Sequence, residues 1–337
     1  MRINNIKQFN EFLKEVIYIY NLKNLHLNTI HNKDCIELMK ELPNECVDLI
    51  IADPPYYKAI NEKWDKQWKT EEEYLNWCKE WFNECVRILK STGVFYCYGN
   101  FDVLSKQKVL IFDKQLNFRQ NITLHKGLRS IAGRTSDKLR MFPTATEYLL
   151  YYVKQNEDSH LENEINHKEL RIYFFNAMKE AGYNRTTLNK KLGHRKAEHT
   201  FYTKSQWWIP TEEVYKELQK IMNLPRSYVD ILNSFNKNRF TFNLPTGITD
   251  VWDFIPDKIR YGHKTQKPID ITNRIIKASS NENDLVYIPF AGSGSEIVSC
   301  IVNNRNYIAT ETNKEYIDNI IMPRVNTYFK ENKLHIS

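Results

Sequence analysis

Short, uninterrupted apolar runs recur along the chain, and many of their residues are β-branched or leucine. The run at 47–52 (VDLIIA) ends directly at Asp53-Pro54-Pro55. A run of this length that lacks alternation and is closed by a turn signal predicts a strand buried on both faces, as in a parallel sheet. The same pattern predicts further strands at 93–98, 148–153, 285–289 and 307–310.

Between these strands, apolar residues repeat with the three-to-four-residue period of amphipathic helices. The clearest example is 71–89, and 268–278 and 296–303 show the same pattern. Strands that alternate with helices indicate an α/β fold with a doubly wound, mostly parallel sheet.

The stretch 155–250 breaks this alternation, because it is rich in aromatic and charged residues and has no run typical of a buried strand. Helices are expected at 170–181 and 185–192, with a third from Lys196. Two helices joined by a short glycine-containing turn have the outline of a helix-turn-helix, although ordinary helical hairpins share it. The chain is therefore expected to consist of residues 1–154, a largely helical insertion at 155–250, and residues 251–337.

The composition places limits on the class of protein. Hydrophobic residues make up 42% of the 337 residues, enough for a packed core, and the net charge of +7 suits a polyanionic partner without requiring one. The six cysteines form no C-x-x-C pair, so we expect reduced thiols and no metal site. No run approaches the ~20 apolar residues that span a bilayer, and there is no signal-peptide core, so we expect a cytoplasmic protein without membrane contact.

The tetrapeptide Asp53-Pro54-Pro55-Tyr56 directly follows the first predicted strand. Ligands of open α/β sheets bind at the carboxyl ends of strands, and burial of an unpaired carboxylate is costly, so Asp53 is expected to line a cleft. The exocyclic amine of a base is a weak nucleophile, because its lone pair is delocalised into the ring. Asp53 and the Pro54 carbonyl can accept its two hydrogens, and Tyr56 offers a face on which a flipped base can stack. The four residues are thus candidate catalytic residues for direct transfer to an amine.

A second motif, Pro289-Phe290-Ala291-Gly292-Ser293-Gly294-Ser295, lies between a predicted strand and a predicted helix. Glycines let the backbone approach a ligand closely, and a helix N-terminus favours a carboxylate. Glu311 follows Gly292 at about the 20-residue distance where an acid binds ribose hydroxyls. Together these features predict a site for a nucleoside-containing cofactor.

The two motifs resemble those of the DNA amino-methyltransferases, and their order, with the catalytic tetrapeptide first, is similar to that of the circularly permuted β class. The segment 263–268 (HKTQKP) is similar to the family's His-Pro-Thr-Gln-Lys-Pro, and 32–35 (NKDC) is similar to its Gly-Asp-Cys. The resemblance implies the fold of the S-adenosyl-L-methionine-dependent methyltransferases and S-adenosyl-L-methionine as cofactor. It implies cofactor contacts from Asp34, Cys35, Asp53, His263, Thr265, Gln266, Lys267, Pro289, Phe290, Ala291, Gly292, Ser293, Gly294, Ser295 and Glu311.

The sequence also departs from the family pattern. Lys33, Lys264, Ile288 and Glu296 stand where glycine, proline, aspartate and threonine are usual. None of these positions belongs to the catalytic tetrapeptide.

Two basic segments are candidates for contacts with double-stranded DNA. Residues 119–140 combine basic and small side chains, which is typical of a flexible loop that grips phosphates and carries no sequence information. Residues 184–197 contain no acid and overlap the second helix of the possible helix-turn-helix, which could read base edges. In the family, target recognition lies between the catalytic and cofactor halves, which implies that role for 155–250. The predicted DNA-binding residues are Lys126, Arg129, Arg134, Lys138, Arg140, Arg185, Asn189, Lys190 and Arg195.

The resemblance thus implies a site-specific DNA methyltransferase of the restriction-modification type, which flips an adenine and methylates its N6. Asp53 favours adenine, because enzymes acting on cytosine N4 mostly carry serine there, and cytosine N4 is the main alternative. Methylation of RNA or of a protein amide, and a non-catalytic helix-turn-helix protein, are further alternatives. A homodimer and a cognate restriction endonuclease are compatible with the resemblance, and the recognition sequence does not follow from it.

Overall fold

The computed structural model of the chain describes residues 27–59, 65–127, 140–154, 168–201, 207–236, 240–243, 247–253, 257, 261–262 and 265–332. The chain divides into two compact units. The first consists of Met1–Lys154 and Thr241–Ser337, and the second of Gln155–Phe240.

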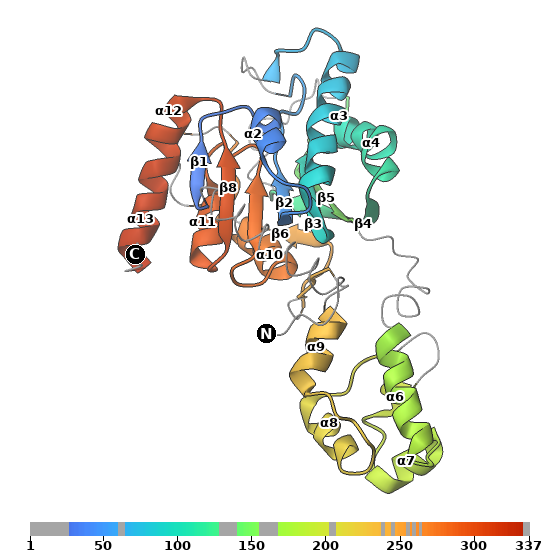
Figure 1. Cartoon of the computed structure of the whole chain (residues 1–337). Coiled ribbons are helices and arrows are strands. Elements are labelled where there is room, and N and C mark those ends of the chain that lie inside the picture. Colours follow the sequence, from blue (N-terminus) through green and yellow to red (C-terminus); the bar gives the residue numbers. More distant parts are fainter. Residues whose placement is uncertain are drawn as a thin grey trace. The chain divides into compact units, whose positions relative to one another are not determined.

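The first unit is built on one sheet with a parallel centre. Within the described ranges the sheet has eight strands. Their order is β1 (Thr29–His31), β8 (Asn306–Thr310), β7 (Leu285–Ile288), β2 (Val47–Ala52), β3 (Leu89–Gly99), β5 (Thr146–Val153), β4 (Asn117–His125) and β6 (Val251–Asp253). The strands from β1 to β3 in this order are parallel, β5 is antiparallel to both its neighbours, and β6 is parallel to β4. Figure 1 shows that blue β1 and red-orange β8, far apart in sequence, lie side by side.

Helices pack on both faces of this sheet. Alternate residues of a strand face opposite sides of the sheet. In β3, Phe95 packs into the core with α3 (Glu71–Ile88). The next residue, Tyr96, faces α10 (Ile269–Ser279), and its hydroxyl lies 2.9 Å from Ser279 Oγ. The expected doubly wound, mostly parallel α/β fold is confirmed. The remaining helices of this unit are α2 (Cys35–Glu41), α4 (Phe101–Leu110), a 3₁₀ turn (Phe112–Lys114), α11 (Ser295–Val302), α12 (Lys314–Tyr316), a π-helical turn (Ile317–Ile321) and α13 (Met322–Asn332).

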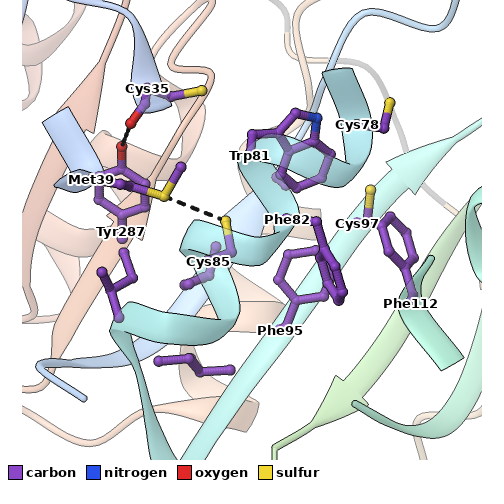
Figure 2. Close-up of a cluster of buried hydrophobic side chains, with 14 of the residues drawn as sticks. Cys35, Met39, Cys78, Trp81, Phe82, Cys85, Phe95, Cys97, Phe112 and Tyr287 are labelled. Carbon is purple, nitrogen blue, oxygen red and sulfur yellow. Dashed lines mark hydrogen bonds between the residues drawn. The ribbon is translucent and has the colours of Figure 1, made fainter. Parts of the chain in front are cut away.

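The core between α2, α3 and the sheet is aromatic and rich in sulfur (Figure 2). Trp81, Phe82, Phe95 and Phe112 are completely buried, and the ring centroids of Phe82 and Phe112 lie 4.5 Å apart. All six cysteines are buried free thiols. This dense packing fixes α3 against β2 and β3, and it therefore also fixes the loop that leaves the end of β2.

The second unit is a helical bundle with its own core. It contains α6 (Lys168–Glu180), α7 (Arg185–Leu192), a 3₁₀ turn (Glu198–Phe201), α8 (Glu212–Gln219) and α9 (Tyr228–Asn236). The helices expected at 170–181 and 185–192 are confirmed. The third helix expected from Lys196 is wrong, because within residues 196–201 the structure has a turn followed by the 3₁₀ turn. The Thr200 carbonyl accepts a hydrogen bond from Trp207 Nε1 at 2.8 Å, which ties this turn to the segment that follows.

Helix α7 begins and ends at the residues that its sequence indicates. Asn184 accepts a hydrogen bond from the Thr187 amide at 3.0 Å, and Thr187 Oγ1 accepts one from the Asn184 amide at 2.9 Å. Gly193 closes the helix with φ +76°, a conformation that favours glycine. Among the helices of the described ranges, none has both the length and the apolar character that a bilayer-crossing segment requires.

Candidate active site

The two sequence motifs emerge at the same edge of the sheet. Strands β2 and β7 are parallel neighbours, with Leu49 opposite Val286 and Ile50 opposite Tyr287. Asp53 and Pro289 therefore follow adjacent strand ends, although they are far apart in the sequence. A cavity of about 430 Å³ opens at this edge. Its lining includes the predicted residues Asp34, Cys35, Asp53, Pro54, Pro55, Tyr56, Thr265, Lys267, Pro289, Phe290, Ala291, Gly292, Ser293 and Glu311.

A buried lysine bonds to both ends of the tetrapeptide Asp53-Pro54-Pro55-Tyr56. Lys267 Nζ lies 3.1 Å from Asp53 Oδ1, 2.7 Å from Glu147 Oε1 and 2.9 Å from the Tyr56 hydroxyl. The three ammonium hydrogens thus have three oxygen acceptors. The Tyr56 hydroxyl is 2.7 Å from Asp53 Oδ1 and also contacts Glu147, and it can donate its single hydrogen to either carboxylate. A second lysine, Lys126, lies 3.1 Å from Glu147 Oε2.

Burial and ion pairing act in opposite directions on these groups. Burial raises the pKa of Asp53 above its usual value, and the charge of Lys267 opposes that shift. Burial alone would also raise the pKa of Glu147, but the charges of Lys267 and Lys126 outweigh this effect and lower the pKa to about 2. The carboxylates raise the pKa of Lys267 in spite of its burial. The cluster therefore holds a charged lysine between acids.

The contacts of Asp53, which lines the cavity, leave one of its carboxylate oxygens without a hydrogen bond from the described residues. Tyr56 and Lys267 both bond to Oδ1. Within the described residues no hydrogen bond to Oδ2 is present, so this oxygen can accept a hydrogen from a ligand. The turn behind it is fixed by Tyr74 of α3, whose hydroxyl donates to the Pro55 carbonyl at 2.6 Å.

The glycine turn after β7 is held from two sides. The Gly292 amide donates to Glu311 Oε2 at 2.9 Å, and Glu311 Oε1 accepts from the Asn313 amide at 2.8 Å. Gly294, with φ +75°, caps α11, and a Cβ there would lie 2.8 Å from Ile321 Cγ2. Buried Arg324 of α13 donates to the Ser293 carbonyl at 3.0 Å. The turn therefore presents its backbone to the cavity in a fixed conformation.

Several predicted cofactor residues support the fold or lie elsewhere. Asp34 lines the cavity, but its carboxylate also caps α2 by accepting from the Ile36 amide at 2.8 Å. Gln266 is buried beside the cavity lining, where its amide donates to Asp257 at 3.0 Å. Gly294 and Ser295 lie behind the lining, and Ser295 Oγ donates to the Lys267 carbonyl at 2.6 Å. His263 lies outside the described residues.

The predicted DNA-binding residues are spread over both units. Lys126 is ion-paired with Glu147 beside the active site, and Arg140 is exposed. In the second unit, Arg185 and Lys190 are exposed on α7, Asn189 is half-buried, and Arg195 pairs with Glu198 at 2.7 Å. Arg129, Arg134 and Lys138 lie outside the described residues.

Several residues of the site were not predicted from the sequence as functional. Glu147, the second residue of β5, pairs with the lysine cluster, Arg324 holds the glycine turn from α13, and Glu296 lines the cavity from the first turn of α11. A charged residue at the start of an apolar strand is one signal that points to Glu147, because the start of an antiparallel strand lies at the edge where its parallel neighbours end. Within the described residues, no group of acidic, histidine or cysteine side chains is arranged to hold a metal ion.

Comparison with known proteins defines first the fold and then the family. A Thermus thermophilus protein solved with S-adenosyl-L-methionine aligns with a TM-score of 0.51 and 16% identity, over 89% of this chain and 93% of its own. The fold is that of the S-adenosyl-L-methionine-dependent methyltransferases. Residues 47–322 match the sequence profile of the DNA methylase family N6_N4_Mtase, and the chain belongs to this family, whose cofactor is S-adenosyl-L-methionine.

Two curated relatives are similar to most of this chain. Type II methyltransferase M.HinfI of Haemophilus influenzae is 27% identical over 87% of this chain and 67% of its own length. DNA adenine methyltransferase YhdJ of Escherichia coli (strain K12) is 28% identical over 86% of this chain and 80% of its own. The chain thus spans about two thirds of the length of M.HinfI.

Proposed function

We propose that this protein is a β-class, site-specific DNA methyltransferase that transfers a methyl group from S-adenosyl-L-methionine to N6 of adenine in double-stranded DNA. The observation that carries the proposal is the position of Asp53 at the cavity, with Oδ1 held by Lys267 and Tyr56 and Oδ2 left for a ligand. The family includes enzymes of both the N6 and the N4 type, and aspartate at position 53 favours adenine.

The residues of the cavity suit the cofactor. The glycine turn presents its backbone at the head of α11, and Glu311 has lone pairs for ribose hydroxyls beside its bonds to Gly292 and Asn313. Phe290 and Trp77 give the cavity an apolar wall, with ring centroids 5.7 Å apart. S-adenosyl-L-methionine supplies an electrophilic methyl group when bound. The roles of the individual lining residues in holding it are part of the proposal.

The protein's contribution to the reaction is to position and polarise the amine. Asp53 Oδ2 accepts one hydrogen of the flipped base's amino group, and the backbone carbonyl of Pro54 is proposed to accept the other. This arrangement localises the nitrogen lone pair toward the methyl group. The amine nitrogen forms the new bond, the donor's sulfur keeps the electron pair of the broken bond, and the proton of the amine leaves to solvent. The Tyr56 ring supports the base while its hydroxyl stays in the lysine cluster.

We assign target recognition to the second unit. It is a separate helical body, and α7 exposes Arg185 and Lys190 while it buries Leu188 in the core. A helix anchored on one side with a basic outer face is suited to a DNA groove. A partner copy and a cognate restriction endonuclease remain expectations from the family.

Product analysis tests the proposed function. The protein is incubated with S-adenosyl-L-methionine and mixed-sequence duplex DNA, and the DNA is digested to nucleosides for mass spectrometry. We expect N6-methyladenine. Detection of N4-methylcytosine alone would transfer the assignment to the cytosine type, and sequencing of the modified DNA would give the recognition site.

A further inference from the structure

One carboxylate oxygen of the cavity, Oε1 of Glu296, has no hydrogen bond among the described residues. Glu296 belongs to the first turn of α11, only 4% of it is exposed, and its side chain lines the cavity together with Asp53. Its Oε1 is buried without a hydrogen bond. A buried carboxylate oxygen that lacks a donor is costly, so the natural occupant of this cavity is a ligand that provides one.

The surroundings of Glu296 favour a cationic donor group. Among the charged residues that line the cavity, carboxylates outnumber the two lysines, Lys33 and Lys267. The Lys267 ammonium is already bonded to Asp53, Glu147 and Tyr56 and has no hydrogen left for Glu296.

We propose that the Glu296 carboxylate pairs with the ammonium group of the methionine moiety of S-adenosyl-L-methionine. This inference rests on the proposed function. The sulfonium centre carries no hydrogen that it could donate, and the target amine faces Asp53 on the other motif. The ammonium carries three hydrogens, and it is attached to the same carbon as a carboxylate that a helix N-terminus favours. Glu296 stands at that terminus, in the second position of α11.

Two ligands isolate the ammonium contact in binding experiments. S-adenosylhomocysteine has the ammonium group but no sulfonium charge, whereas 5′-methylthioadenosine retains the adenosine and thioether and lacks the amino acid part. Dissociation constants for both are measured by calorimetry with the wild-type full chain, Glu296→Gln and Glu296→Thr. Glu282→Gln, an exposed carboxylate of the same unit, serves as the control.

Both variants of Glu296 should bind S-adenosylhomocysteine about 10- to 100-fold more weakly, the effect of one lost charge-assisted hydrogen bond. Their affinity for 5′-methylthioadenosine should stay within about twofold of the wild type, because uncharged ligands make no such bond. Unchanged affinity for S-adenosylhomocysteine, or equal weakening of both ligands, overturns the inference. A wild-type protein that binds neither ligand contradicts the proposed function itself.

Discussion

Lys267 Nζ lies 3.1 Å from Asp53 Oδ1, so the lysine that precedes α10 is bonded directly to the acid that follows β2. The resemblance assigns this lysine to the cofactor, whereas in the structure its ammonium is fully engaged by Asp53, Glu147 and Tyr56. We therefore propose that Lys267 positions Asp53 and Tyr56, the two ends of the proposed catalytic tetrapeptide.

Removal of this ammonium should be severely destabilising. Lys267→Met removes the cation that pairs with the buried Glu147 and the partly buried Asp53, and loss of one partner of a buried ion pair costs about 3–5 kcal/mol. Lys126→Met is the matched control, because Lys126 contacts the same Glu147 from a site that is 36% exposed, where about 1 kcal/mol or less is expected. Urea unfolding of both variants gives the two free energies. Equal losses of unfolding free energy in the two variants would show that burial of an ion pair does not determine how much it contributes to stability.

Asp53→Ala should slow turnover strongly while it leaves ligand binding largely intact. The change removes the acceptor of the amine hydrogen, for which loss of a factor of about 10²–10³ in rate is typical. In the proposed function, phosphate contacts hold the DNA and the glycine turn holds the cofactor, so the dissociation constants of both ligands should change little. Single-turnover rates measured beside these constants test the mechanism. A near-normal single-turnover rate would exclude a role for Asp53 in polarising the amine.

Glu296 should make the stability of the ligand-free protein decrease with pH. Burial, followed by the charge of Asp53, raises its pKa from 4.5 to about 7, against the opposing charges of Lys267 and Arg324. Between these two pH values the folded protein holds more protons than the unfolded chain, so stability is lost as the pH rises. At about 1.4 kcal/mol per pKa unit, the loss amounts to more than about 3 kcal/mol and is complete above pH 7.

Glu296→Gln should therefore be more stable than the wild type at pH 8, and the difference should vanish below about pH 4.5. Tyr98 and Cys300, which also lie near this carboxylate, are uncharged throughout this range because burial raises the pKa of each. Chemical denaturation at a series of pH values measures the difference. A constant difference at every pH would mean that titration of Glu296 is not its source.

Gly294→Ala should disturb the cofactor turn more than an equivalent change elsewhere. A side chain at Gly294 is unfavourable for two reasons: the backbone φ is +75°, and its Cβ would lie 2.8 Å from Ile321 Cγ2. At Gly193 the φ is similar, +76°, but nothing lies within 4 Å, so Gly193→Ala serves as the control for backbone strain of about 1–2 kcal/mol. Thermal unfolding and the dissociation constant of S-adenosylhomocysteine should both be affected more strongly by Gly294→Ala. Identical effects would mean that contact with Ile321 is unimportant.

Replacement of Arg185 or Asn189 by alanine should relax preference at one or two base pairs, at about 1–3 kcal/mol each. Neutralising Arg129 and Arg134 should instead weaken binding to every sequence and reduce the salt slope by about 0.9 per lost phosphate contact. Salt titrations of DNA binding and sequencing of methylated DNA distinguish the two effects. If the methylated motif is unaltered in the first pair of variants, α7 supports the fold and does not read bases.

The central elements of the fold could be predicted because their residues are buried on both faces. Strands β2, β7 and β8 and the helices α3, α10 and α11 follow directly from apolar pattern, and the two motifs between them locate the cavity. Strands β1, β4 and β6 were not predicted, because they are short or exposed on one face and their sequences carry no continuous apolar run. Sheet pairing, which makes them strands, is a long-range property.

The site was predictable in outline but not in its internal contacts. Motif spacing placed Asp53, Gly292 and Glu311 at one cavity. The ion pair between Lys267 and Glu147 was not predicted, because it joins residues from two segments whose separation in the sequence carries no signal of contact. The same is true of Arg324, a buried cation on the last described helix that reaches back to the glycine turn.

The pairing of β1 with β8 and of β2 with β7 has a consequence for synthesis on the ribosome. The tetrapeptide that follows β2 is translated before the helical unit, but β7, the strand beside β2 in the sheet, is translated only after that unit. The helical unit, whose core comes from residues 170–235 alone, can become compact first. A nascent chain that contains Asp53 but has not yet reached Gly292 and Glu311 lacks one wall of the cavity, so the site can form only after both segments have been synthesised.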